Sequence, residues 1–258
     1  MKLLDAAMGT RLMARGLNLA TADPCLWNLS HADSVFRVHS ADLAAGAQCI
    51  STNTFGANRF WLGRYASADQ TAIVNQEAVA IARRAISESG KQAEIAGSIG
   101  PTAFFDEKTL REQIEILMAA GVDRLIFETL APPAARQLCQ WQIQKYSVEI
   151  WVSFFDWGTH PHDQARMLLE SGFTTLGLNC MNDKRKILHI LKQLTDINAI
   201  SLFLKPSRMH FPSVLAMANQ FSAKGLNAIG GCCGTDEHWI RMLASRLITS
   251  DFSSDRLA

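Results

Sequence analysis

The sequence alternates between short apolar segments and longer amphipathic stretches, and this alternation occurs eight times along the chain. The apolar segments are residues 3–8, 49–55, 94–99, 125–130, 149–155, 174–180, 199–205 and 228–233. Each carries few charges and is rich in β-branched, leucine or phenylalanine side chains, which is typical of a strand buried on both faces. Parallel strands need crossover connections long enough to hold a helix, so the alternation predicts a parallel sheet with helices between its strands.

The stretches between the segments have the features of helices. Residues 32–45, 68–89, 108–120, 164–171 and 213–224 carry helical patterns, and a glycine follows each of them directly. Glycine is a common helix stop because it adopts left-handed backbone without strain. Pro132 opens a further helix, and the pairs Asn182-Asp183 and Thr235-Asp236 look like N-caps. Eight strand–helix units predict a single (β/α)8 barrel, with an open doubly wound sheet as the alternative.

Composition narrows the class of protein further. Hydrophobic residues make up 48% of the chain and charged residues 19%, which excludes a disordered chain and fits one domain over residues 1–258. The net charge of +1 gives no support for a nucleic-acid-binding surface. No apolar run approaches the length of a membrane helix, and Asp5 lies where a signal peptide would be apolar. We therefore expect a cytoplasmic protein with reduced cysteines.

Acids and thiols fall at the carboxyl ends of several predicted strands, where barrel enzymes place their active sites. Asp5, Glu128, Cys180 and the adjacent pair Cys232 and Cys233 hold these positions. We expect the three thiols to meet at one face of the barrel with the two carboxylates nearby. Three thiolates suit zinc with one open coordination position, and soft sulfur is a poor ligand for magnesium or calcium. Alternatively, Cys180 is a core residue and the cysteine pair lines a glycine turn.

Six motifs in order resemble those of the homocysteine S-methyltransferase family. They are residues 4–10, 52–59, 97–102, 127–129, 177–180 and 230–235. The resemblance implies a (β/α)8 barrel that transfers a methyl group to the sulfur of homocysteine and so gives methionine. It implies that Cys180, Cys232 and Cys233 bind one zinc ion per chain, with no catalytic residue beyond that site.

The same resemblance suggests how the substrate is held. Asp5, Thr54 and Glu128 would bind the amino-acid part of homocysteine, since carboxylates accept charge-assisted hydrogen bonds from an α-ammonium group. Two structural alternatives remain open. Asp5 caps the turn that follows it, or Glu128 pairs with an arginine such as Arg124 or Arg136.

Two departures from the family pattern bear on the site, one on the acceptor and the other on the donor side of the cleft or an oligomer contact. Ala6 stands where the family usually has glycine, and one methyl group there crowds a close-lying substrate. Residues 205–208 read Lys-Pro-Ser-Arg where relatives usually carry a Tyr-Pro-Asn-like motif and a longer loop. These departures keep two further hypotheses open: another small thiol or a selenol as acceptor, or a non-catalytic zinc- or thiol-binding barrel that regulates a partner.

The methyl donor is not fixed by the sequence. The candidates are S-methylmethionine, betaine, and a methylated corrinoid carried by a partner protein, because a single barrel leaves no residues for a corrinoid domain. The first two donors are cations and would favour an aromatic cage. Trp27, Phe55, Phe104, Phe105 and Trp157 are the aromatic residues expected on or near the loops of the active face.

Overall fold

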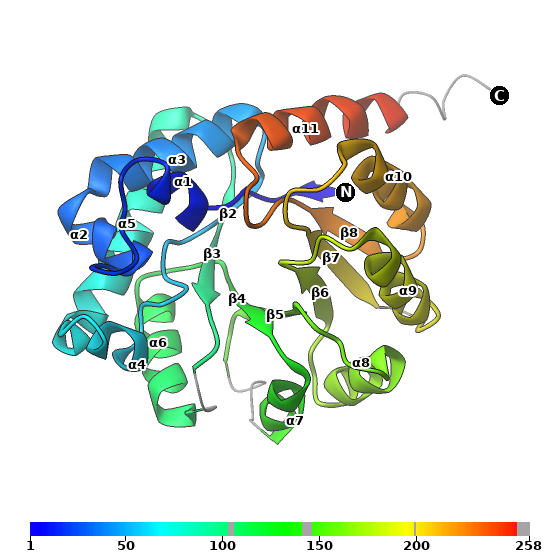
Figure 1. Cartoon of the computed structure of the whole chain (residues 1–258), viewed down its shortest axis with the longest axis horizontal. Helices are drawn as coiled ribbons and strands as arrows, with labels where there is room; N and C mark the ends of the chain where they lie inside the picture. The colour runs from blue at the N-terminus through cyan, green and yellow to red at the C-terminus, as the bar shows by residue number, and fades with distance from the viewer. Residues whose placement is uncertain (103–105, 141–145, 199, 252–258) are drawn as a thin grey trace.

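Eight parallel strands form one sheet that curls into a barrel with helices around its outside (Figure 1). The computed structural model describes residues 1–102, 106–140, 146–198 and 200–251. The strands are β1 (Lys2–Leu3), β2 (Cys49–Ser51), β3 (Glu94–Ile99), β4 (Arg124–Leu130), β5 (Glu149–Phe154), β6 (Thr175–Asn179), β7 (Ser201–Lys205) and β8 (Leu226–Ile229). Their order is β1-β8-β7-β6-β5-β4-β3-β2, and a parallel bridge between Leu4 and Cys49 joins the two end strands. The predicted (β/α)8 barrel is confirmed.

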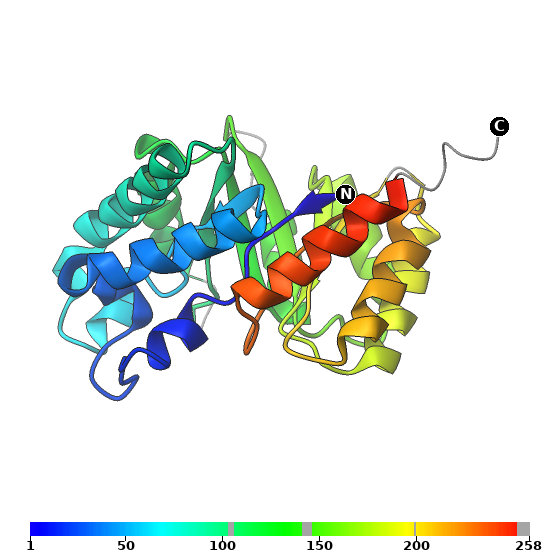
Figure 2. The same ribbon diagram turned by 90° about the horizontal axis from the view of Figure 1, so that it is seen from above.

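Helices lie between consecutive strands and cover the outside of the sheet (Figure 2). The α-helices are α1 (Gly9–Met13), α2 (Trp27–Ser30), α3 (Ala32–Ala45), α4 (Arg59–Gly63), α5 (Thr71–Ser89), α6 (Glu107–Ala119), α7 (Pro132–Gln140), α8 (Pro161–Glu170), α9 (Lys184–Thr195), α10 (Phe211–Ser222) and α11 (Glu237–Asp251). Two 3-10 turns, η1 (Pro24–Leu26) and η2 (Ala68–Gln70), precede α2 and α5. No helix in the described ranges is long and apolar enough to span a membrane.

Most element boundaries lie close to the predicted ones. Gly46 ends α3 in the left-handed conformation at φ 111°, and Asp183 caps α9 by accepting hydrogen bonds from two backbone N–H groups. The stretch 68–89 is divided into a 3-10 turn and a helix. The first and last strands are shorter than predicted, since β1 ends at Leu3 and β8 at Ile229. Asp5 and the cysteine pair therefore lie on the loops that follow these two strands at the carboxyl end of the barrel.

One layer of side chains fills the interior of the barrel. Its buried residues are Leu4, Cys49, Ala96, Ile126, Trp151, Phe203 and Ala228. On β6, Gly177 pairs with Phe203, and a Cβ at this glycine would lie 2.4 Å from the ring. The aromatic ring thus occupies space that only a glycine leaves free. The larger apolar cluster lies between the sheet and the surrounding helices.

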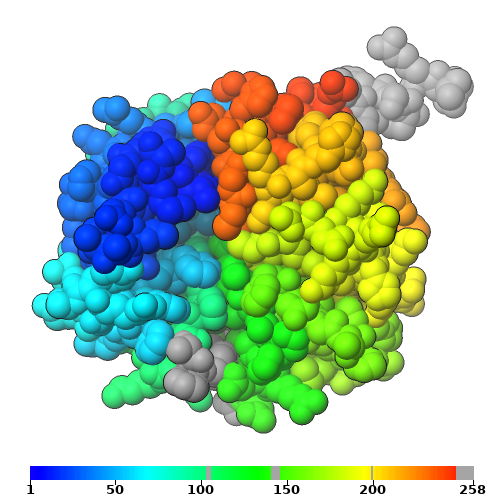
Figure 3. Space-filling view, viewed as in Figure 1, coloured from blue at the N-terminus to red at the C-terminus, as the bar shows by residue number. Residues whose placement is uncertain are grey.

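Ion pairs close the amino end of the barrel. Arg124 lies 2.5 Å from Glu94 and 2.6 Å from Glu149, and its guanidinium lies 4.6 Å from the centroid of the Trp151 ring. Lys2 pairs with Glu94 at 2.6 Å. With the amino end closed and the interior filled, the polar residues at the carboxyl end form a site on one face. The space-filling view shows a hollow near the centre of this face, bordered by the blue N-terminal segment and the orange loop after β8 (Figure 3).

Candidate metal and substrate site

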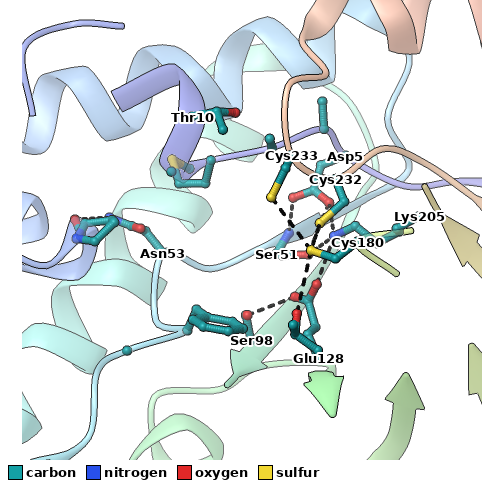
Figure 4. A pocket seen from close by; sticks show the side chains of 18 of the residues that line it. Asp5, Thr10, Ser51, Asn53, Ser98, Glu128, Cys180, Lys205, Cys232 and Cys233 are labelled. Carbon is teal, nitrogen blue, oxygen red and sulfur yellow. Dashed lines mark hydrogen bonds and ion pairs between the residues drawn. The ribbon is translucent and has the colours of Figure 1, made fainter. Parts of the chain in front are cut away.

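The sulfurs of Cys180, Cys232 and Cys233 converge at the carboxyl end of the barrel (Figure 4). Cys180 directly follows β6, and the other two lie in the loop after β8. The Sγ atom of Cys180 lies 2.8 Å from that of Cys232 and 3.7 Å from that of Cys233, and all three lie within 4.8 Å of one another. The three sulfurs converge as predicted. The alternative, in which Cys180 is a core residue apart from the cysteine pair, does not agree with these distances.

The donor set fits zinc. Tetrahedral zinc with Zn–S bonds of about 2.3 Å places its sulfurs about 3.8 Å apart, so the Cys180–Cys233 separation already suits it and the Cys180–Cys232 pair would open slightly. Hydrogen bonds from the thiols of Cys180 and Cys232 lower the pKa of Cys233 well below its usual value. The hydrogen bond with Cys180 raises the pKa of Cys232. One negative charge is therefore concentrated on Cys233, the most exposed of the three sulfurs.

Asn179 holds the backbone around the first sulfur. Its Oδ1 accepts hydrogen bonds from the backbone N–H of Thr129 and the hydroxyl of Ser153, each at 2.9 Å, and its Nδ2 donates to Thr129 Oγ1 at 2.8 Å. Thr129 and Cys180 both adopt left-handed backbone, at φ 61° and 57°. Such conformations are costly for residues other than glycine and persist where the surroundings fix them. The amide of Asn179 thus ties the ends of β4, β5 and β6 together and directs Cys180.

Next to the sulfurs, a buried cluster of polar residues joins the ends of five strands, β1, β2, β3, β4 and β7. Asp5 accepts hydrogen bonds from the backbone N–H of Ser51 at 2.6 Å and from its hydroxyl at 3.1 Å. The Nζ of Lys205 donates to Asp5 Oδ1 at 3.0 Å and lies 3.7 Å from Glu128 Oε2. The hydroxyl of Ser98 donates to Glu128 Oε1 at 2.9 Å. Figure 4 shows the side chains of Asp5, Glu128 and Lys205 pointing toward one another next to the cysteines.

The charge of Lys205 is maintained by its two acidic neighbours. Burial by itself lowers the pKa of a lysine, but Asp5 and Glu128 oppose that effect, and the net result is a pKa raised above the usual value. A buried lysine without such partners would lose its proton. Lys205 is therefore a permanent cation at the base of the site.

The structural alternatives for the two carboxylates do not describe this arrangement. Asp5 binds Ser51 and Lys205 rather than capping the turn after it. Arg124, four residues before Glu128 on the same strand, pairs with acids at the opposite end of the barrel. Arg136 is exposed on α7. Both carboxylates thus line the cavity that the cysteines also line, and their predicted contact with substrate stays a prediction.

Thr54 lies deeper than the other predicted substrate residues. Its side chain is fully buried, and its hydroxyl donates to the carbonyl oxygen of Ser98 at 2.7 Å and lies 2.6 Å from the hydroxyl of Thr52. It is absent from the lining of the cavity, whereas Thr52 belongs to it. The predicted contact between Thr54 and substrate stays a prediction, and it would require this hydroxyl to leave its present partners.

Ala6 fits its position without strain. The described residues other than glycine that have positive φ are Ala66, Thr129 and Cys180, so the backbone at Ala6 does not demand glycine. The loop is held from outside by the buried pair of Arg11 and Asp42. Arg11 Nε donates to the carbonyl of Ala7 at 2.6 Å, and the Asp42 carboxylate accepts the backbone N–H of Ala6. The methyl group of Ala6 lines the cavity and reduces the space beside Asp5.

The sulfurs and the charged cluster line one cavity of about 460 Å³. Its other walls come from the segments after β1 and β2 and from Ser98 on β3. The apolar side chains of Met13, Leu19 and Phe55 also line it, and each is more than a third exposed. Of the aromatic residues expected near this face, Phe55 lines the cavity, while Trp27 and Trp157 are buried elsewhere. Phe104 and Phe105 lie outside the described residues.

Sequence reasoning assigned no role to Lys205. The available signal was a charged residue at the last position of an otherwise apolar strand, similar to the charged residue near the end of a strand that identified Glu128. Ser51 was harder to find, because hydroxyls at strand ends are common and only their partners show what they position.

Comparisons with known proteins agree with this site. The family model described as homocysteine S-methyltransferase matches residues 2–247. The chain is 27% identical to the methionine synthase of Mycobacterium tuberculosis and 26% identical to that of Mycobacterium leprae, over 93% of its own length in each case. It covers only 24% of the length of these two curated relatives.

A solved structure of similar size extends the comparison. The metallated form of the homocysteine methyltransferase MmuM from Escherichia coli superposes with a TM-score of 0.83 at 26% identity, covering 95% of this chain and 96% of that one. Its apo form gives a TM-score of 0.78. With a family match over nearly the whole chain and cysteines converging as the motifs predict, the chain belongs to the homocysteine S-methyltransferase family.

Proposed function

We propose that the chain catalyses transfer of a methyl group to the sulfur of a small thiol at a zinc ion held by Cys180, Cys232 and Cys233. The acceptor that the family implies is homocysteine, and the product is then methionine. The observation that carries the proposal is the convergence of three thiols over a cavity whose base holds Asp5 and Glu128. A cavity with sulfur ligands at its mouth and charged groups at its base suits a thiol that has a polar end.

Zinc, when bound, would supply Lewis acidity that keeps the acceptor sulfur deprotonated at neutral pH. The residues of the chain set the rest of the geometry. Asn179 and Thr129 direct Cys180, and the exposure of Cys233 leaves the cluster open toward the cavity. Asp5 and Glu128, with Lys205 between them, would face the polar end of the substrate. Holding the acceptor at both ends fixes its sulfur relative to the incoming methyl group.

The donor is one of three: S-methylmethionine, betaine, or a methylated corrinoid on a partner protein. A cationic donor held by aromatic faces would need several rings around it. Among the described aromatic residues named as cage candidates, Phe55 alone lines the cavity. The donor assay below distinguishes the three.

The first experiment measures zinc and activity together. We expect the purified chain to hold about one zinc ion, and Cys233→Ser to lose most of it, since a three-sulfur site cannot spare a ligand. Cys139→Ser is the matched control, because Cys139 lies on α7 with its thiol against the carbonyl of Met167. Absence of zinc from protein purified without chelators would refute the proposal.

Methyl transfer is then assayed by incubating the zinc-loaded chain with homocysteine and each donor in turn. Methionine formed from S-methylmethionine alone would exclude a required corrinoid partner. Zinc and thiol binding without product from any donor would support the non-catalytic barrel instead. A second candidate function keeps the zinc site and uses another small thiol or a selenol, and the specific observation in its favour is the buried cation of Lys205.

A further inference from the structure

The ammonium group of Lys205 occupies the space between the two carboxylates at the base of the cavity. It lies 3.0 Å from Asp5 and 3.7 Å from Glu128, and it also donates to the hydroxyl of Ser51 at 3.2 Å. The three charged side chains are each less than a tenth exposed. The cation is therefore part of the buried cluster and is shielded from solvent.

The position of this cation is fixed by the fold. Lys205 is the last residue of β7, where it pairs with Asn179 of β6, and its carbonyl accepts the backbone N–H of Cys180 at 3.2 Å. Pro206 follows and restricts the backbone further. Because the side chain is buried, it cannot turn outward to solvent without opening the cluster.

The hydrogen-bonding capacity of the carboxylates is largely occupied. A carboxylate offers about four lone-pair positions, and Asp5 already accepts from Ser51 twice and from Lys205 once. Glu128 has one oxygen bound to Ser98 and the other facing Lys205. A second ammonium group within hydrogen-bond distance of both acids would lie beside the first. Lys205 would repel it, and because Lys205 already neutralises one of the two acids, they attract a further cation less than two unpaired carboxylates would.

We propose that Lys205 takes the place of the acceptor's ammonium group between Asp5 and Glu128, so that this site prefers aliphatic thiols without an α-ammonium group. The inference rests on the proposed thiol methylation and concerns only its acceptor. With one cation supplied by the chain itself, the acids need no charge from the substrate. An α-ammonium group would find the position between the acids already occupied, and burying it without hydrogen-bond partners costs free energy.

The test compares two thiols that differ in a single group. Homocysteine and γ-mercaptobutyrate have the same chain length, thiol and carboxylate, and only homocysteine carries the α-ammonium group. Binding to the zinc-loaded chain is measured by calorimetry near neutral pH, so that no knowledge of the donor is needed. We expect γ-mercaptobutyrate to bind at least about tenfold more tightly, a difference of about 1.4 kcal/mol.

Variants at position 205 separate the effect of the lysine's charge on thiol preference from the effect of its shape. Lys205→Met removes the cation, and we expect it to reverse the preference in favour of homocysteine. Lys205→Arg keeps the charge and should keep the preference of the native chain. Lys205→Gln serves as a second neutral variant, and thermal unfolding with and without each thiol shows whether homocysteine stabilises the neutral variants more than the native chain.

The outcomes distinguish the two proposals. Tighter binding of homocysteine by the native chain would overturn the inference and leave the proposed methyl transfer intact. Equal preference in native and neutral variants would also overturn it. Failure of the native chain to bind zinc would count against the proposed function itself. If neither neutral variant folds, the ratio of the two thiol affinities measured on the native chain decides whether the inference holds.

Discussion

The ammonium group of Lys205 lies 3.0 Å from the carboxylate of Asp5, although the two residues are 200 positions apart in the chain. They meet because β1 and β7 both flank β8 in the barrel, so that their carboxyl ends face the same cavity. Both side chains are almost fully buried. Breaking a buried pair leaves an uncompensated charge, which costs far more than the pair contributes when intact.

The first prediction follows from this pair. Asp5→Asn should lower the free energy of unfolding by about 3–5 kcal/mol, because Lys205 then keeps only the more distant Glu128 as a charged partner. Urea unfolding measures the loss. Asp33→Asn is the matched control, since Asp33 pairs with Arg84 on the surface at 3.2 Å and should cost less than about 1 kcal/mol. Equal losses in the two variants would show that the buried pair does not form.

A substitution at Asn179 tests the candidate metal site without removing any of its sulfurs. Asn179→Ala deletes three hydrogen bonds that direct the left-handed turn at Thr129 and Cys180. We expect zinc affinity to fall by about tenfold or more, as is usual when a group that orients a metal ligand is lost. Competition with a chromophoric chelator measures this affinity. Asn219→Ala, on the exposed face of α10, should leave it unchanged, and an equal fall there would contradict the assigned role.

His39 makes stability depend on pH. It lies fully buried on α3, and within the described part of the chain neither ring nitrogen has a hydrogen-bond partner. Burial lowers the pKa of His39 from 6.5 to about 4, with Asp5 opposing the effect and Arg11 adding to it. In the unfolded chain His39 therefore takes up a proton below pH 6.5, whereas in the folded chain it does so only near pH 4. Stability is lost as the pH falls through this interval, by about 3 kcal/mol.

The variant His39→Leu should remove this contribution. Its free energy of unfolding should fall less steeply than that of the native chain between pH 6.5 and about pH 4. Urea unfolding at several pH values measures both slopes, and their difference cancels the pH dependence of the cysteines. His238→Gln, at an exposed position, is the control. Parallel slopes for the native chain and His39→Leu would exclude His39 as the source.

Gly177 offers a prediction about packing inside the barrel. A methyl group at this position would lie 2.4 Å from the ring of Phe203, and both residues are in the interior, where neither strand can move apart. Gly177→Ala should destabilise the chain by about 1–3 kcal/mol through overpacking. Thermal or urea unfolding measures it. The double variant Gly177→Ala with Phe203→Leu should lose less than the sum of the single variants, and strict additivity would show that the two side chains do not compete for space.

The sequence by itself determined the architecture and which residues gather at the candidate metal site. Eight apolar segments of strand length, separated by helical stretches with glycine stops, leave few alternatives to a barrel, because parallel strands buried on both faces need helices around them. Parallel strands also align their carboxyl ends, so residues at those ends could be expected to meet. This local rule located Cys180, Cys232, Cys233, Asp5 and Glu128 without knowledge of any distance.

Only the tertiary structure decided what these residues contact. The reach of a long side chain and the partners of a hydroxyl depend on which strand ends lie side by side, and spacing along the chain does not show this. Lys205 illustrates the limit: at the end of an apolar strand it reads as one more polar residue, yet it is the cation between two acids. Thr54 illustrates the converse, since its hydroxyl is engaged by Ser98 and points away from the cavity lining. The strand pattern determines at which end of the barrel a residue lies. The packing of segments distant in the sequence determines which charged groups it contacts.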